Sequence, residues 1–274
     1  MSDETFQALA VFITLNLGIK MPLEKKTMLQ ARILKRLRAL HISTFEEYCE
    51  LLFSKKGIRD ELPHLFDVTT TNKTDFFREP GHFEFLATEL LPNFCSYKPC
   101  SHEDPVVFWS AGCSTGEEPY TLAIVLEEFK LGNPWFHYVI LASDISTQVL
   151  ATAKKAIYRE DKIEPVPYEL RKKYLLKSKD NTEKLVRIIP RLRSKIRFFR
   201  LNLMEDKFIL PSKVDIIFCR NVMIYFSKEI QSQLVMKFHA VLKSKGFLFT
   251  GHSETLVNLN LPFQLIIPTV YQKK

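Results

Sequence analysis

Residues 106–118 read VVFWSAGCSTGEE, an apolar run followed by a turn of small residues and then by two glutamates. The apolar run is typical of a buried strand, and residues 117–130 after it have helical character. Short buried strands that alternate with helices predict a parallel, doubly wound α/β sheet. The other predicted strands are residues 138–143, 196–199, 214–218, 247–250 and two more around Pro268, and the other helices are 147–156 and 228–242.

The composition is that of a globular protein that buries a core. The chain has 274 residues, of which 46% are hydrophobic and 26% charged. The uncharged run of residues 5–19 is shorter than the ~20 residues of a membrane span. It follows two acidic residues, so it also does not read as a signal peptide. Five scattered cysteines favour a reducing compartment, and we therefore expect a cytoplasmic protein with no membrane insertion.

The net charge of +8 is unevenly distributed. Residues 20–38 and 154–200 are strongly basic, whereas residues 76–153 carry three basic and ten acidic side chains. Two basic blocks predict a surface for an anionic partner, although a solvated helix face and a basic loop would give the same pattern.

Three predicted loops meet at the carboxyl ends of the strands, where open α/β sheets bind ligands. The turn at residues 110–116 lets a ligand lie against the backbone, but the glutamates after it would repel a pyrophosphate, which disfavours NAD and ATP. Asp144 ends the second strand, where a carboxylate can accept hydrogen bonds from ribose hydroxyls. Residues 219–226 form a polar loop after the fourth strand. This layout is typical of an S-adenosylmethionine methyltransferase.

Four stretches of the chain resemble a known family. Residues 70–79 read TTNKTDFFRE, residues 110–120 SAGCSTGEEPY, residues 218–226 FCRNVMIYF and residues 251–254 GHSE. In this order they resemble the chemotaxis receptor methyltransferase family, CheR. The resemblance implies an α/β class I S-adenosylmethionine methyltransferase fold with a small antiparallel β-subdomain, preceded by an all-α N-terminal domain. The expected parts are a helical receptor-docking domain (1–68), a linker with the first cofactor motif (69–100) and a methyltransferase domain (101–274) whose β-subdomain is inserted at about 166–196.

The resemblance also implies the activity and the residues that serve it. It implies transfer of a methyl group from S-adenosylmethionine to glutamates on the cytoplasmic helices of chemoreceptors, for sensory adaptation, with S-adenosylhomocysteine as product. Arg78 and Tyr225 are the expected catalytic residues. The expected cofactor contacts are Asn72, Thr74, Arg78, Glu118, Asp144, Asn202, Leu203, Arg220 and Asn221.

The predicted methyl transfer needs little acid–base catalysis. A glutamate acceptor, with an ordinary pKa of ~4.3, is already ionised at neutral pH, so no general base is needed. No metal is needed either, and no metal-ligand cluster is evident; Cys95, Cys100 and His102 lie close together but lack the spacing of a zinc site. Arg78 is placed to bind the carboxylate of the cofactor or to steer the incoming glutamate, Tyr225 to border the transferred methyl, and His252 to close a turn.

The predicted partner is the cytoplasmic domain of a chemoreceptor. Residues 23–38 have amphipathic spacing, and their basic side chains are expected to dock on clustered receptor glutamates. In family members that tether to a C-terminal receptor pentapeptide, the loop of the β-subdomain is glycine-rich, but this chain has no glycine between Gly132 and Gly246. Binding of that pentapeptide is therefore doubtful. The expected docking residues are Lys25, Arg32, Lys35, Arg36 and Arg38.

Two other functions remain open at this stage. An RNA methyltransferase would suit the basic blocks. The acidic segment 76–153 disfavours it, as does Asn221-Val222-Met223-Ile224, which lacks the Pro-Pro-aromatic loop of amino-group methylation, so no nucleic-acid partner is expected. A non-catalytic, cofactor-bound receptor adaptor is disfavoured because Arg78, Asp144 and residues 221–225 form an intact set.

Overall fold

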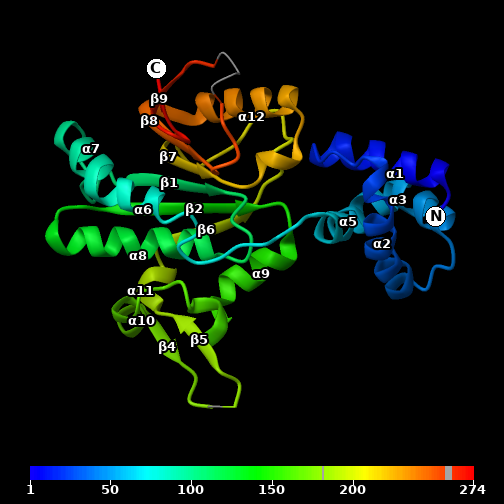
Figure 1. The fold of residues 1–274 in the computed structure, drawn as a ribbon, viewed down its shortest axis with the longest axis horizontal. Helices are drawn as coiled ribbons and strands as arrows, with labels where there is room; N and C mark the ends of the chain where they lie inside the picture. Colours follow the sequence, from blue (N-terminus) through cyan, green and yellow to red (C-terminus); the bar gives the residue numbers. More distant parts are fainter. Residues whose placement is uncertain (181, 257–260) are drawn as a thin grey trace.

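The computed structural model describes residues 1–180, 182–256 and 261–274. A helical domain at the N-terminus is joined by residues 70–75 to a domain built on a sheet, and the two domains lie side by side (Figure 1). Among the described helices, none is both long and apolar enough to cross a membrane. The helices of the first domain are α1 (Asp3–Leu17), η1 (Leu23–Lys25), α2 (Lys26–Leu40), α3 (Phe45–Phe53), α4 (Lys55–Asp60) and α5 (Leu62–Thr69).

The helical domain has its own apolar core. On α2 the buried residues are Leu29, Ile33 and Leu37, and this spacing of four places them on one face of the helix. They pack with buried side chains of α1, α3 and α5 in one cluster. The amphipathic pattern predicted for residues 23–38 is therefore confirmed as the face that builds this core.

Within the described residues, seven strands form one sheet in the order β6-β2-β1-β7-β8-β10-β9. The first five of these are mutually parallel, and β10 pairs antiparallel with both β8 and β9. The predicted doubly wound sheet is confirmed, as is the final pair of strands around Pro268. The strands are β1 (Val106–Ala111), β2 (Tyr138–Asp144), β6 (Ile196–Arg200), β7 (Val214–Cys219), β8 (Leu242–Thr250), β9 (Phe263–Ile267) and β10 (Val270–Lys273).

Helices cover both faces of the sheet (Figure 1). Successive strand residues point to opposite faces, so Phe108 joins the core on the α8 side and Trp109 joins the core on the α12 side. Strands buried on both faces explain why the sequence shows continuous apolar runs. The helices of this domain are α6 (Gly81–Phe85), η2 (Leu86–Leu90), α7 (Leu91–Tyr97), α8 (Glu117–Gly132), α9 (Thr147–Lys155), η4 (Met223–Tyr225) and α12 (Lys228–Val241).

A small antiparallel sheet projects from the larger one (Figure 1). Its order is β3-β5-β4, with β3 at Ile157–Arg159, β4 at Leu175–Lys177 and β5 at Leu185–Ile188. The expected range of about 166–196 for this insert therefore starts too late, because it omits β3. Three residues are too few to show an alternating pattern in the sequence. The helices η3 (Glu160–Ile163), α10 (Tyr168–Tyr174) and α11 (Pro190–Arg193) complete the region.

Candidate active site

A cavity of about 300 Å³ lies where the carboxyl ends of β1, β2 and β7 meet the helical domain. Its size lies at the lower end of the range for small-molecule sites. Most of its polar walls come from residues 70–78 and from the loops after these three strands and β6. The structure brings together in its lining every residue expected to contact cofactor or to act in catalysis. These are Asn72, Thr74, Arg78, Glu118, Asp144, Asn202, Leu203, Arg220, Asn221 and Tyr225.

The turn after β1 has a backbone conformation that lets a neighbouring loop or a ligand approach it closely. Gly112 and Gly116 have φ values of 83° and 100°, in the region that favours glycine. A Cβ atom on Gly112 would lie 2.6 Å from Cγ2 of Val222, in the loop after β7. The two loops therefore meet only because residue 112 lacks a side chain, and this contact shapes the wall of the cavity.

Asp144 is buried at the end of β2 and organises the turn beside it. Its Oδ2 accepts a hydrogen bond from the backbone N–H of Ser114 at 2.9 Å, and its Oδ1 accepts one from Ser146 N–H at 3.0 Å. Burial raises the pKa of this carboxyl, although the backbone hydrogen bonds oppose the shift. A carboxylate has about four acceptor positions, so Asp144 can still accept a hydrogen bond from a hydroxyl of a bound ligand.

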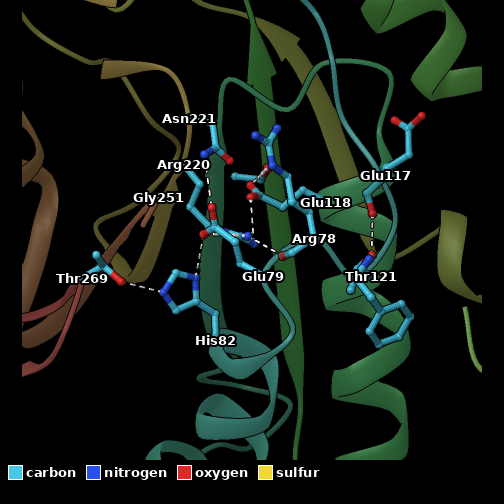
Figure 2. A network of polar contacts seen from close by, with 12 residues as sticks. Arg78, Glu79, His82, Glu117, Glu118, Thr121, Arg220, Asn221, Gly251 and Thr269 are labelled. Carbon is cyan, nitrogen blue, oxygen red and sulfur yellow. Dashed lines mark hydrogen bonds and ion pairs between the residues drawn. The ribbon is translucent and has the colours of Figure 1, made fainter. Parts of the chain in front are cut away.

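Arg220 is the centre of an ion-pair network (Figure 2). Its side chain is 2% exposed, and its Nη2 lies 3.2 Å from Oε2 of Glu79 while its Nη1 lies 3.5 Å from Oε2 of Glu118. It also donates to the carbonyl of Arg78. Arg220 thus lines the cavity and at the same time fixes two carboxylates and the Arg78 backbone.

The two glutamates that begin α8 have different surroundings. Glu118 lines the cavity, and its Oε1 accepts a hydrogen bond from the Ser110 hydroxyl at 2.7 Å. Glu117 is not among the lining residues and points away from Glu118 and Arg220 (Figure 2), and its carboxylate accepts a hydrogen bond from the Thr115 hydroxyl at 2.6 Å. Burial raises the pKa of both carboxyls. Only one of the two carboxylates that the sequence placed at this turn therefore faces the cavity.

Glu254 is a structural residue of the site that sequence reasoning missed. Its carboxylate accepts hydrogen bonds from the backbone N–H groups of Asn221 and Gly251, each at 2.7 Å, and of Ile224 at 3.1 Å. Asn221 has a φ of 60°, an uncommon value for a residue with a side chain. Glu254 thus clamps the loop after β7 to the loop after β8. Its place in the GHSE motif was the only signal in the sequence.

The segment that leads into the second domain is tied to the turn after β1. The hydroxyl of Ser114 donates to the carbonyl of Asn72 at 2.9 Å. Arg78 is half-buried, and its Nη1 donates to the carbonyl of Lys73 at 3.1 Å. Arg78 and Thr74 line the cavity from this segment, which places a guanidinium at its wall.

The helical domain supplies part of the cavity, which the sequence did not predict. Leu17, Ile19 and Met21, at and after the end of α1, line it together with Lys25 and Met28. Such contacts between distant parts of a chain leave no local sequence signal.

Backbone and side-chain hydrogen bonds fix this contact between the domains. The N–H of Lys20 donates to the Tyr225 carbonyl at 2.9 Å, and the Asn202 side chain donates to the Asn16 carbonyl at 2.8 Å. The side chain of Asn202 is thus already engaged in joining the domains. Lys25 Nζ lies 6.0 Å from the centre of the Tyr225 ring, so a cation and an aromatic ring meet at the junction.

The expected docking face on α2 is not a single free surface. Arg36 makes two hydrogen bonds with the buried carboxylate of Glu61, at 2.8 and 2.7 Å, and Arg32 donates to the carbonyl of Thr69 at 2.7 Å. These two arginines hold α5 against α2, so their expected role in docking needs correction. Lys35 and Arg38 are exposed and remain available for docking on an acidic partner.

Two groups of potential metal ligands differ from the sequence-based expectation. The structure brings Glu79, His82 and His252 together, although no ligand cluster was evident in the sequence. The thiols of Cys95 and Cys100 lie 2.7 Å apart, and the His102 ring instead packs against the His137 ring, with centres 5.3 Å apart.

Comparison with known proteins agrees with this geometry. The family model described as CheR methyltransferase, SAM binding domain, matches residues 72–271, and the model described as CheR methyltransferase, all-alpha domain, matches residues 4–70. A chemotaxis protein methyltransferase of Borreliella burgdorferi is 40% identical over 94% of this chain and 90% of its own length. Proteins of the same name from Salmonella typhimurium and Escherichia coli are 36% and 35% identical over 99% of this chain and 90% and 91% of theirs.

Proposed function

This chain belongs to the CheR methyltransferase family, and we propose that it methylates glutamate side chains on the cytoplasmic helices of a chemoreceptor, giving methyl esters. The family makes it a methyltransferase of chemotaxis that uses S-adenosylmethionine. The observation that supports glutamate side chains as the substrate is the set of residues that line the cavity. It combines three carboxylates with four cations, and these are Asp75, Glu118 and Asp144, and Lys25, Lys73, Arg78 and Arg220.

The residues of the cavity suit S-adenosylmethionine. The carboxylates of Glu118 and Asp144 can accept hydrogen bonds from an amine and from hydroxyls, and the turn at Gly112 brings the backbone close. The apolar side chains of Leu17 and Leu203 offer a dry surface beside them. When bound, this cofactor supplies a methyl group on a positively charged sulfur.

The acceptor needs little activation from the protein. A glutamate with an ordinary pKa of ~4.3 is ionised at neutral pH, so it attacks without a general base. Of the described residues that line the cavity, none is a histidine or a cysteine, which fits a reaction without one. Arg78 would hold the incoming carboxylate by charge-assisted hydrogen bonds, and Tyr225 would border the reacting atoms.

Positioning and the exclusion of water then account for the rate. Attack by a carboxylate on a sulfonium consumes two opposite charges, so water would stabilise the separated reactants more than the transition state. Residues 17–28 of the helical domain close the cavity on one side. Holding the reacting groups in line contributes up to about 7–11 kcal/mol in well-oriented systems.

The proposal is tested by incubating the chain with methyl-labelled S-adenosylmethionine and either a receptor cytoplasmic fragment or total RNA. We expect base-labile label in the receptor fragment, and its loss when the accepting glutamates are replaced by alanine. Label in RNA would contradict the proposed substrate. Label in neither, with cofactor binding intact, would favour a non-catalytic adaptor.

A further inference from the structure

Glu79, His82 and His252 converge beside the active site although they come from two segments of the chain, residues 79–82 and the loop after β8. Oε2 of Glu79 lies 3.5 Å from Nδ1 of His82 and 3.9 Å from Nε2 of His252. One ligand atom from each residue can be chosen so that all lie within 4.8 Å of one another. Glu79 precedes α6, His82 belongs to α6 and His252 follows β8, so only the folded chain assembles the group.

The hydrogen bonds of His82 define which of its nitrogens carries a lone pair. Nε2 of His82 lies 2.8 Å from Oγ1 of Thr269, and this hydroxyl donates its hydrogen to the carbonyl of Pro268. The hydroxyl oxygen must therefore accept from His82, which places the ring proton on Nε2. Nδ1 is then an acceptor, directed toward Glu79 (Figure 2).

This arrangement leaves two hydrogen-bond acceptors, Nδ1 of His82 and Oε2 of Glu79, facing each other in the interior. The His82 side chain is 3% exposed, and its Nδ1 has no hydrogen-bond partner among the described residues. A buried acceptor without a partner is unfavourable. A metal cation held between Nδ1 of His82 and Oε2 of Glu79, which lie 3.5 Å apart, would give both acceptors a partner.

The surrounding charge also favours a cation. Two carboxylates, from Glu79 and Glu118, pair with the single guanidinium of Arg220, and the carboxylate of Glu254 lies close enough to Glu118 to act on it electrostatically. When all three are ionised, this part of the site carries an excess of negative charge.

We propose that Glu79, His82 and His252 bind a transition-metal dication of the zinc type. Two imidazoles and one carboxylate are a ligand set that zinc uses when a fourth position is left for water. Thr269 would orient His82 through its other ring nitrogen, as outer partners of metal-bound histidines do. The His252 side chain is 65% exposed, so it provides access from solvent and the freedom to close on the ion.

Arg220 links this metal site to the active-site cavity. It shares Oε2 of Glu79 at 3.2 Å, so a bound dication would compete with it for that oxygen. Arg220 also pairs with Glu118, which lines the cavity. Zinc is therefore expected to weaken cofactor binding, and cofactor to weaken zinc binding by the same factor. This linkage rests on the cofactor cavity, whereas metal binding itself does not depend on any methyl transfer.

The test is a calorimetric titration of zinc ions into the full chain carrying Cys95→Ser and Cys100→Ser, because the two thiols are an alternative pair of zinc ligands. We expect one ion per chain with a dissociation constant in the micromolar range or below. His252→Ala should weaken binding at least tenfold, and thermal melting should show the fold retained because this side chain is exposed.

His137→Ala is the matched control, because His137 and His102 form another histidine pair. Zinc affinity should not change in this variant. His82→Ala, where it folds, should abolish binding. Absent binding, unchanged affinity in His252→Ala, or loss in His137→Ala would each overturn the proposal. Activity does not enter the measurement, so its outcome is independent of the receptor assay.

Discussion

Asp144 shows how one carboxylate can serve both the fold and the ligand. Its oxygens already accept hydrogen bonds from the N–H groups of Ser114 and Ser146, so it fixes the turn that forms the cavity wall. We predict that Asp144→Ala weakens cofactor binding at least tenfold, since charge-assisted hydrogen bonds contribute roughly 1.5–3 kcal/mol. Asp144→Asn keeps one acceptor oxygen and should have a smaller effect. Calorimetry with folded variants measures both, and unchanged affinity in Asp144→Ala would exclude the predicted role.

Arg78 should matter for turnover more than for stability. It is half-buried, and among the described residues its side chain makes one hydrogen bond, to the Lys73 carbonyl, so its loss should cost the fold little. Misplacement of a reacting group by about 1 Å typically costs about 100-fold in rate, and Arg78 is proposed to hold the incoming carboxylate in place. We predict a loss of this size for Arg78→Ala with an unchanged melting temperature. Arg78→Lys keeps the charge but not the fork of donors and should be intermediate. Turnover near that of the wild type would refute the role.

Sequence reasoning grouped residues that line one cavity where a motif carries them. Asn72, Glu118 and Asn221 lie far apart in the chain, yet the structure places them around one cavity. It failed where the role depends on a partner from another element. Glu254 binds three backbone N–H groups, and Glu79 meets two histidines, only after the loops have come together.

At the scale of elements, α2 is attached to α5 by a buried ion pair that the charge pattern did not reveal. Glu61 is 4% exposed, and both of its oxygens accept from Arg36. We predict that Arg36→Ala lowers the free energy of unfolding by about 3 kcal/mol, because it leaves a buried carboxylate without its cation. Urea unfolding followed by circular dichroism measures the effect. Lys35→Ala, at an exposed position of the same helix, should change stability by less than about 0.5 kcal/mol, and an equal effect of the two would contradict the argument.

The small sheet gives a second prediction at this scale. In β3-β5-β4, β4 is an outer strand to which a peptide could add, and the chain between β4 and β5 contains no glycine. Lys184 in this connection has a φ of 45°, a value that glycine would adopt more easily. Lys177 also pairs with Glu160 at 2.9 Å, which ties the ends of the two outer strands together.

We therefore predict no measurable binding of a receptor pentapeptide that ends in an aromatic residue. A receptor fragment without that tail should be methylated as fast as one with it. Calorimetry tests the first statement and a paired rate assay the second. Micromolar binding of the pentapeptide would show that the missing glycines do not alter the edge of the sheet.

The helices and strands that could be predicted are those with a long hydrophobic pattern in the sequence. The strands at residues 106–111, 138–144 and 214–219 are buried on both faces and stand out as apolar runs. By contrast, β3 has three residues, of which only Tyr158 is buried, and its partner β5 lies almost thirty residues later. A strand this short forms only through pairing with its neighbour, and no local sequence pattern indicates that pairing.

At the scale of the whole molecule, the helical domain is both a wall of the cavity and the carrier of exposed positive charge. Met21 and Lys25 line the cavity, whereas Lys35 and Arg38, further along on α2, face solvent. A receptor helix with clustered glutamates that docks on this face would therefore lie on the same domain that forms one wall of the cavity. The sequence predicted the charge and the cavity separately, but their proximity follows only from the way the two domains pack.

This arrangement predicts that docking and cofactor binding respond differently to charge. Lys35→Glu combined with Arg38→Glu should raise the KM for a receptor fragment by about fivefold or more, since each exposed ion pair contributes roughly 0.2–1 kcal/mol and reversal adds repulsion. Cofactor affinity should not change, because neither residue is among those that line the cavity. Receptor methylation should also slow as salt rises from about 0.05 to 0.3 M, since exposed charges are screened over ~8–10 Å.

The matched control reverses two exposed lysines at the opposite edge of the sheet. Lys213 directly precedes β7, and Lys245 lies near the start of β8, so both sit at the amino ends of parallel strands, away from the cavity. Lys213→Glu combined with Lys245→Glu changes the net charge by the same amount, and it should leave the KM for receptor almost unchanged. An equal rise in KM for both pairs would mean that net charge alone attracts the receptor. No rise for the α2 pair would mean that this face of the helix is merely solvated and that the receptor approaches from another side.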